Sequence, residues 1–235
     1  MPNRHIPYWA KHFAVAGIVK FGLGYTIKSM ISPFIENFIR RGILKSLQII
    51  EAFKKIDRAD FVLPELKEQA YINEPLPIGE GQTISQPYTV AFMLELLQPE
   101  LGNKIFEIGF GSGWQTALLA EIVSKTGKVF AVERIPELYR FGRKNIAKYG
   151  FIKNGLVKTI GGDATLGLKR HAPFDRIIAA ASAEEIPNEW LKELKIGGRL
   201  VAPIKNSIWL YIKKSEKEFE KKEFPDFVFV PLVRS

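Results

Sequence analysis

The chain contains no cysteine and only three histidines among its 235 residues. The absence of cysteine excludes disulfide bonds, thiolate catalysis and cysteine metal sites. Two of the histidines, His5 and His12, lie at the start of the chain, far in sequence from His171. The sequence therefore offers no histidine cluster for a metal or a catalytic triad, and we expect no metal site.

Acidic residues are absent from residues 1–31, which carry four basic side chains. The apolar stretch of this segment, residues 12–27, is interrupted by Lys20 and is shorter than the roughly 20 apolar residues that a membrane span needs. We assign residues 1–31 as a basic, apolar N-terminal extension. Three interpretations stay open: a flexible or untranslated leader upstream of Met30, a helix on a membrane surface, and a signal-peptide hydrophobic region.

The overall composition is that of a globular protein, with 46% hydrophobic and 25% charged residues. The length suffices for one large domain with its own core. The net charge of +9 suits a nucleic acid or an anionic membrane as a partner, and equally a solvated basic surface. Charge alone therefore does not identify a partner.

Two segments of different character precede the main alternation of elements. Apolar residues recur every three or four positions over residues 32–60, which predicts helices with a break near Gly42 and Ser46. Residues 62–88 are rich in proline and glycine, which predicts a long loop. Long loops in compact domains usually serve function, so we expect this one to form part of a site.

From residue 89 predicted strands and helices alternate, which favours a parallel sheet covered on both faces. The strands are predicted at residues 104–108, 128–133, 156–160, 174–180 and 199–203, and the helices at 91–97, 114–124, 136–149 and 187–194. Two further strands, 208–212 and 227–232, are predicted to be antiparallel and joined by a solvated, charged loop at 213–223. The fold class is thus α/β: a Rossmann-like, doubly wound, mostly parallel seven-stranded sheet with an antiparallel C-terminal hairpin and N-terminal helices.

The strongest motif is the glycine-rich run Glu107–Gly113, which follows a predicted buried strand and precedes a helix. Glycines allow a sharp turn and a close approach of a ligand to the backbone. A dinucleotide site needs G-x-G-x-x-G, but the third glycine would fall on Trp114 or Thr116. The observed E-x-G-x-G-x-G is typical of S-adenosylmethionine-dependent methyltransferases. Glu133, at the end of the next strand, is placed to accept the ribose hydroxyls of that nucleoside.

A second carboxylate, Asp163, follows the third predicted strand of the sheet. A side chain at the carboxyl end of a parallel strand lies in the ligand crevice, where it can accept the adenine amino group. The alternative is that Asp163 caps the next helical turn. The sequence leaves both open.

From about residue 32 to the end the sequence resembles the protein-L-isoaspartate O-methyltransferases. The most specific shared segment is Gly81–Pro87, which reads Gly-Gln-Thr-Ile-Ser-Gln-Pro just before the cofactor strand. Further shared segments are Arg58–Val62, Ala70–Tyr71, Pro75–Gly79 and Phe229–Leu232. The resemblance implies methyl transfer from S-adenosylmethionine to the carboxylate of L-isoaspartyl residues in damaged proteins, which is a repair reaction.

The resemblance also implies roles for individual residues. Ser85 is the family's active-site serine, and since no histidine base is in sight we expect it to position the substrate carboxylate rather than attack it. The implied cofactor-binding residues are Thr83, Gly109, Gly111, Gly113, Glu133, Asp163 and Ala164, and the substrate-binding residues are Ile84, Ser85 and Val230. Residues 32–88 would be the N-terminal helices and the substrate loop, and 89–235 the cofactor-binding core. We expect a cytoplasmic monomer that acts on isoaspartyl peptides and proteins.

The chain departs from the family pattern at two places. Ala164 stands where the family commonly has glycine, and Ile204–Lys205 replaces a Val-Gly pair, with no glutamine following. The alternative functions are a methyltransferase of the same fold acting on RNA or another substrate, and a binding module without catalysis that contacts a membrane through residues 1–31. Residues 179–184 lack the Asn/Asp-Pro-Pro-aromatic motif of amino-group methylation, so we expect no nucleic-acid partner.

Overall fold

The computed structural model describes residues 27–232, and the predicted extension at residues 1–31 lies almost entirely outside this range. A seven-stranded sheet has the order β5-β4-β3-β6-β7-β8-β9, and all neighbours from β5 to β7 are parallel, whereas β8 and β9 are antiparallel. This confirms the predicted α/β fold. The strands are β3 (Lys104–Ile108), β4 (Lys128–Glu133), β5 (Val157–Gly161), β6 (Phe174–Ala179), β7 (Leu194–Ile204), β8 (Ser207–Lys213) and β9 (Phe219–Pro225).

The helices cover both faces of the sheet. In β4, Val129 and Ala131 pack into the cluster formed with the larger set of helices, whereas Phe130 and Val132 pack on the opposite face with Trp190. This alternation follows from the pleat of a strand that is buried on both sides. The first face carries α1 (Ile27–Arg40), α2 (Leu47–Lys55), α3 (Pro87–Leu97), α4 (Trp114–Val123) and α5 (Pro136–Ala147), and the second carries α6 (Asn188–Glu193).

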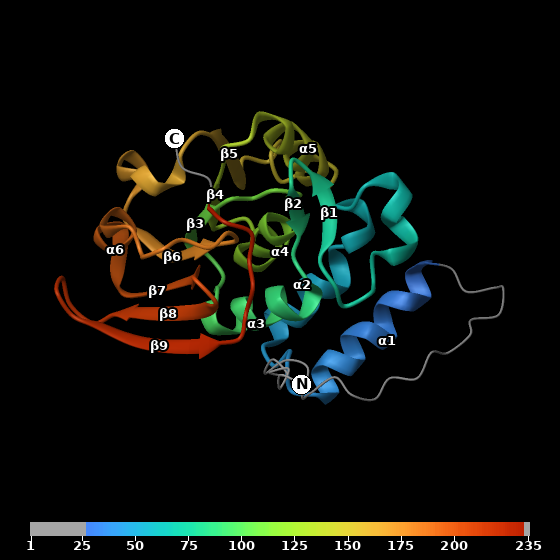
Figure 1. Cartoon of the computed structure of the whole chain (residues 1–235), viewed down its shortest axis with the longest axis horizontal. Helices are drawn as coiled ribbons and strands as arrows, with labels where there is room; N and C mark the ends of the chain where they lie inside the picture. The colour runs from blue at the N-terminus through green and yellow to red at the C-terminus, as the bar shows by residue number, and fades with distance from the viewer. Residues whose placement is uncertain (1–26, 233–235) are drawn as a thin grey trace, which may run out of the picture.

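The break between the first two helices lies where the sequence predicts it. Gly42 adopts a left-handed φ of 65°, and Ser46 is the N-cap residue of α2. The backbone N–H and the hydroxyl of Ser46 both donate to the carboxylate of Glu95 on α3, at 2.9 and 2.7 Å. The N-terminal helices are thereby joined to the main fold, on the side of the molecule opposite to β8 and β9 (Figure 1). None of the helices in residues 27–232 is long and apolar enough to cross a membrane.

The predicted long loop at residues 62–88 contains regular structure, so that prediction was wrong in part. Besides the short 3₁₀ helix η3 (Pro64–Gln69), it holds an antiparallel hairpin of β1 (Leu76–Gly79) and β2 (Gln82–Ile84). The turn between the strands uses three left-handed residues, Gly79, Glu80 and Gly81. The glycines that suggested irregular structure are needed there because they adopt positive φ at little cost. We call residues 76–84 the substrate hairpin.

The C-terminal hairpin is present, but its second strand is not where the sequence predicts it. Strand β9 begins inside the charged run 213–223 that was expected to be a solvated loop, and residues 227–232 form no strand. The outermost strand of a sheet exposes much of its surface, and lysines there discourage pairing with other chains. Residues 227–232 instead return across the sheet: Phe227 stacks on Tyr88 with ring centroids 6.3 Å apart, and Pro231 forms a parallel bridge with Ser182.

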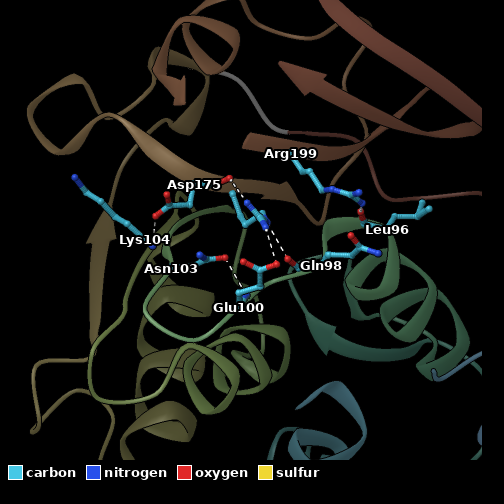
Figure 2. A network of polar contacts seen from close by, with 8 residues as sticks. Leu96, Gln98, Glu100, Asn103, Lys104, Asp175 and Arg199 are labelled. Carbon is cyan, nitrogen blue, oxygen red and sulfur yellow. Dashed lines mark hydrogen bonds and ion pairs between the residues drawn. The ribbon is translucent and has the colours of Figure 1, made fainter. Parts of the chain in front are cut away.

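A polar network ties the amino ends of the strands to the end of α3 (Figure 2). Two arginines on β6 and β7 donate to the last carbonyl groups of this helix: Arg176 Nε to Gln98 at 2.9 Å and Arg199 Nη1 to Leu96 at 2.7 Å. Asp175 accepts from the backbone N–H of Lys104 at 2.7 Å. The two arginine contacts satisfy carbonyl groups at the end of the helix that lack an intrahelical partner. The network lies at the amino ends of the parallel strands, opposite to their carboxyl ends.

Candidate active site

A cavity opens at the carboxyl ends of β3 and β4. The parts of the chain that line it include the loop after β3, the end of β4, the substrate hairpin, the segments that follow β5 and β6, and residues 230–232. The chain runs outward from β3 through β4 to β5 and then returns to β6 on the other side of β3. Ligands of open α/β sheets bind at such a reversal point.

The loop after β3 has the predicted glycine turn. Gly109, Gly111 and Gly113 all have a positive φ, between 46° and 85°. Gly109 and Gly111 line the cavity, whereas Gly113 does not. A Cβ atom on Gly113 would lie 2.7 Å from Ile146 and 2.8 Å from the carbonyl oxygen of Gly142. Gly113 is therefore required behind the loop, where α5 packs, and a direct cofactor contact for it stays a prediction.

Helix α5 supports this loop through three residues that the sequence reasoning did not identify. Gly142 lies against the carbonyl group of Gly111, and Asn145 donates to the carbonyl oxygen of Ser112 at 3.1 Å. Together with Ile146 they are spaced by three and four positions and so share one face of the helix. An isolated glycine inside a predicted helix was the available signal, since it usually has a packing reason.

Glu133, predicted to hold the ribose, lines the cavity and is 7% exposed. Its carboxylate accepts from three backbone N–H groups: Oε2 from Gly111 at 2.9 Å, and Oε1 from Arg134 at 2.8 Å and Ile135 at 3.0 Å. Glu133 therefore shapes the glycine loop from the neighbouring strand. Each carboxylate oxygen can accept more than one hydrogen bond, so ribose hydroxyls can still be accepted there.

Glu107 is a fully buried carboxyl group in the cavity wall. Its pKa is raised to about 7, mainly by burial and to a smaller extent by the nearby Glu133, whereas hydrogen bonds to the carboxylate lower it. Gln115 donates to Oε1 at 3.2 Å, whereas Oε2 has no hydrogen-bond partner among residues 27–232. A buried carboxylate oxygen without a partner fits a cationic ligand. S-adenosylmethionine, with a sulfonium and an ammonium group, is such a ligand.

The segment after β5 agrees with the capping interpretation of Asp163. Its Oδ1 accepts from the backbone N–H and the hydroxyl of Thr165, at 2.9 and 2.7 Å, at the start of a 3₁₀ turn. Gly162 and Ala164 line the cavity, but Asp163 is not among its lining residues. Ala164 is 7% exposed, and its carbonyl oxygen accepts from the indole N–H of Trp190. Contact between Asp163 and adenine stays a prediction.

The structure brings together the residues predicted to handle the substrate. Thr83, Ile84 and Ser85 line the cavity from one side, and Val230 lines it with Pro231 and Leu232. The backbone holds this second wall in place, since the N–H of Ser182 donates to the carbonyl oxygen of Val230 at 2.8 Å. Within the described residues the histidine, His171, stacks on Phe130 and does not line the cavity. Ser85 thus has no histidine base in the described part of the chain, whereas nucleophilic attack by a serine needs such a base.

Comparison with known proteins gives a consistent result. The sequence model of the family described as protein-L-isoaspartate(D-aspartate) O-methyltransferase matches residues 29–235. A protein-L-isoaspartate O-methyltransferase of Staphylothermus marinus is 46% identical over 209 residues, covering 85% of this chain and 92% of the relative. One of Methanopyrus kandleri is 41% identical over 203 residues, covering 85% and 89%.

A solved structure shares the whole architecture. A Plasmodium falciparum protein, assigned as a protein-L-isoaspartate O-methyltransferase and crystallised with S-adenosyl-L-homocysteine, superposes with a TM-score of 0.79. It is 27% identical, and the match covers 90% of this chain and all of that one. The likeness therefore extends over most of the chain.

Proposed function

Because this chain belongs to the protein-L-isoaspartate(D-aspartate) O-methyltransferase family, we infer that it transfers a methyl group from S-adenosylmethionine to the carboxylate of L-isoaspartyl residues in proteins. One observation in the structure carries this conclusion. The substrate hairpin with Ser85 and the glycine loop after β3 face the same cavity. A carboxylate held by Ser85 therefore lies beside the place where the cofactor binds.

The reaction needs little acid–base chemistry from the protein. A carboxyl group has a pKa near 4, so the substrate is already ionised at neutral pH, roughly 3 pH units above that value. When bound, S-adenosylmethionine supplies an electrophilic methyl group on a sulfonium. The protein must then orient the carboxylate in line with that methyl group and exclude water, and such positioning can lower a barrier by roughly 7–11 kcal/mol.

We assign the cofactor contacts to both sides of the glycine loop. The backbone of Gly109 and Gly111 lies against the methionine part, Glu133 accepts the ribose hydroxyls, and Thr83 covers the cofactor from the hairpin. Glu107 adds a buried negative charge near the cationic groups. The support is that all five residues line one cavity and that Glu107 has an oxygen without a partner.

We assign substrate positioning to Ser85, with Ile84 and Val230 as the walls. The Ser85 hydroxyl donates a hydrogen bond to the isoaspartyl carboxylate, which holds the attacking oxygen in place. Such a bond to a charged group contributes roughly 1.5–3 kcal/mol. The two departures from the family pattern are compatible with this site. In particular Lys205, where the family has glycine, still adopts the left-handed backbone with a φ of 52°.

Three further proposals concern the division of the chain, the compartment and the oligomeric state. We propose that residues 32–88 carry the substrate hairpin, that residues 89–235 form the cofactor-binding core, and that the enzyme acts as a cytoplasmic monomer. The proposed boundary falls in the first turn of α3, which begins at Pro87 shortly after the hairpin.

The substrate class is tested by offering the chain labelled S-adenosylmethionine together with an isoaspartyl peptide or with RNA. A carboxyl methyl ester releases volatile methanol in mild base, whereas a methylated base does not. We expect base-labile label on the peptide alone. Base-stable label on RNA would instead support the alternative methyltransferase function.

A further inference from the structure

The substrate hairpin is fixed at its base by one buried side chain, Arg58. Its Nη2 atom donates to the carbonyl oxygens of Glu74, at 3.0 Å, and Ser85, at 3.1 Å. Glu74 precedes the first hairpin strand and Ser85 directly follows the second. A single nitrogen therefore joins the two ends of the hairpin.

The other terminal nitrogen of Arg58 binds the segment that leads into the hairpin. Nη1 donates to the carbonyl oxygens of Ala70 at 2.7 Å and Ile72 at 3.4 Å. The rigid fork of a guanidinium suits several acceptors in fixed positions. Four carbonyl groups from two separate stretches of chain thus converge on one side chain.

Among residues 27–232, no carboxylate is paired with the charge of Arg58. Arg58 is 3% exposed, and burial lowers its pKa to about 9. The adjacent acids are engaged elsewhere: Asp57 accepts from Tyr71 at 2.5 Å and Asp60 accepts from Tyr149 at 2.8 Å. A buried cation without a counter-ion costs stability. Its presence is best explained by what its hydrogen bonds position.

Arg58 also contacts the cofactor side of the cavity. Its guanidinium carbon lies 5.3 Å from the centre of the Trp114 ring, a cation–π geometry. Trp114 is the first residue of α4, directly after the glycine loop, and it lines the cavity. The same side chain therefore touches both walls between which substrate and cofactor must meet.

We propose that Arg58 is a positioning residue that holds Ser85 and the substrate hairpin in register with the cofactor loop. The effect on methyl transfer rests on the proposed function, whereas the effect on the hairpin does not. Displacement of a reacting group by about 1 Å can lower a rate by ~10²-fold. Of the proposed cofactor contacts only that of Thr83 lies on the hairpin, whereas Gly109, Gly111, Glu107 and Glu133 lie outside it, so cofactor affinity changes much less than kcat.

The test compares Arg58→Lys with a matched control, Arg176→Lys. Lysine keeps the charge but lacks the fork. Arg176 is also a buried arginine that donates to backbone carbonyl groups, those of Gln98 and Asp175, but it lies in the polar network at the end of α3 and does not line the cavity. Amide hydrogen exchange of residues 74–85, binding of S-adenosylhomocysteine and kcat on an isoaspartyl peptide are measured for both variants.

For Arg58→Lys we expect faster exchange confined to residues 74–85, a dissociation constant for S-adenosylhomocysteine within about threefold of the wild type, and kcat lower by ~10- to 100-fold. The control should leave hairpin exchange and kcat unchanged. Unchanged exchange in Arg58→Lys, or faster exchange spread evenly over the chain as from general destabilisation, would overturn the proposal. If the wild type methylates no isoaspartyl peptide, the proposed function fails but the exchange comparison still tests Arg58.

A measurement on the wild type covers the case in which Arg58→Lys does not fold. Nitrogen-edited NMR of the guanidinium should show separate, slowly exchanging Nη protons for Arg58, because four carbonyl groups restrain its rotation. Rapidly averaged Nη protons would contradict the proposal.

Discussion

Gly142 of α5 packs so closely on Gly111 of the cofactor loop that no side chain fits between them. A Cβ atom on Gly142 would collide with the carbonyl oxygen of Gly111 and would lie 2.8 Å from two ring carbons of Phe110. Helix α5 therefore sets the position of the loop from behind. The shape of the cofactor site thus depends on a residue that does not line it.

The Gly142→Ala variant tests this dependence. Alanine in place of glycine inside a helix normally stabilises a protein by about 0.5–1 kcal/mol. Here we expect the opposite sign, with a lower melting temperature and weaker binding of S-adenosylhomocysteine, because the loop must shift. Calorimetry measures both. Arg143→Ala, at the neighbouring exposed position, is the control, and equal behaviour of the two variants would refute the packing argument.

A second prediction concerns the hydrogen bonds of Glu133. In Glu133→Gln one carboxylate oxygen becomes an NH₂ group, which cannot accept from Gly111 or from the pair Arg134 and Ile135. We expect binding of S-adenosylhomocysteine to weaken by roughly tenfold to a hundredfold, since hydrogen bonds to a charged group contribute about 1.5–3 kcal/mol each. Calorimetric titration measures this change. Wild-type affinity in the variant would show that Glu133 does not shape the cofactor site.

The Ser85→Ala variant separates substrate positioning from cofactor binding. Losing a hydrogen bond to the substrate carboxylate should lower kcat/KM by roughly tenfold to a hundredfold. The affinity for S-adenosylhomocysteine should stay within about threefold, because Ser85 is assigned a hydrogen bond to the substrate and none to the cofactor. Loss of one hydrogen bond to the cofactor would change the affinity by more than about threefold. Ser215→Ala, at the exposed turn between β8 and β9, serves as the control. A Ser85→Ala variant with full activity would remove Ser85 from the mechanism.

The raised pKa of Glu107 predicts a pH dependence of cofactor binding. The pKa of Glu107 lies near 7, above the usual 4.5, so the carboxyl group is protonated at lower pH. Its contribution to folding stability is therefore fully present below about pH 4.5 and is lost as the pH rises through 7. Cationic cofactor groups favour the ionised form. If binding requires that form, affinity should be about tenfold higher at pH 8 than at pH 6.

The Glu107→Gln variant is the control for this pH dependence, because it removes the titrating group while keeping the shape. We expect its affinity to vary much less between pH 6 and pH 8. The neighbouring carboxylate of Glu133 is unchanged in this variant, so any remaining slope is assigned to other groups. A flat profile in the wild type would show that Glu107 does not titrate on binding.

The sequence predicts the central strands better than the periphery. The bounds of β3 and β4 agree with the prediction, because a strand buried on both faces is a continuous apolar run ending at a glycine or a turn. Strand β9 was missed because an exposed edge strand carries lysines and has no such run. The substrate hairpin was missed because its short strands contain the proline and glycine that usually mark loops.

The candidate site divides in the same way. Gly109 and Glu133 belong to a local motif and could be named from the sequence pattern, and Ser85 could be named from the family resemblance. The residues that support them, such as Arg58 and Gly142, act through contacts between segments far apart in the chain. Local pattern gives at most a hint of such contacts, as the glycine inside a predicted helix does for Gly142, and the structure is needed to identify the partner residues.

The most direct test of the proposed function compares two peptides that differ only in one linkage. One contains an L-isoaspartyl residue and its twin contains the normal L-aspartyl residue at the same place. With S-adenosylmethionine and the wild-type chain, we predict base-labile methyl incorporation into the isoaspartyl peptide and none above background into its twin. Equal incorporation into both peptides, or into neither, would contradict the assignment.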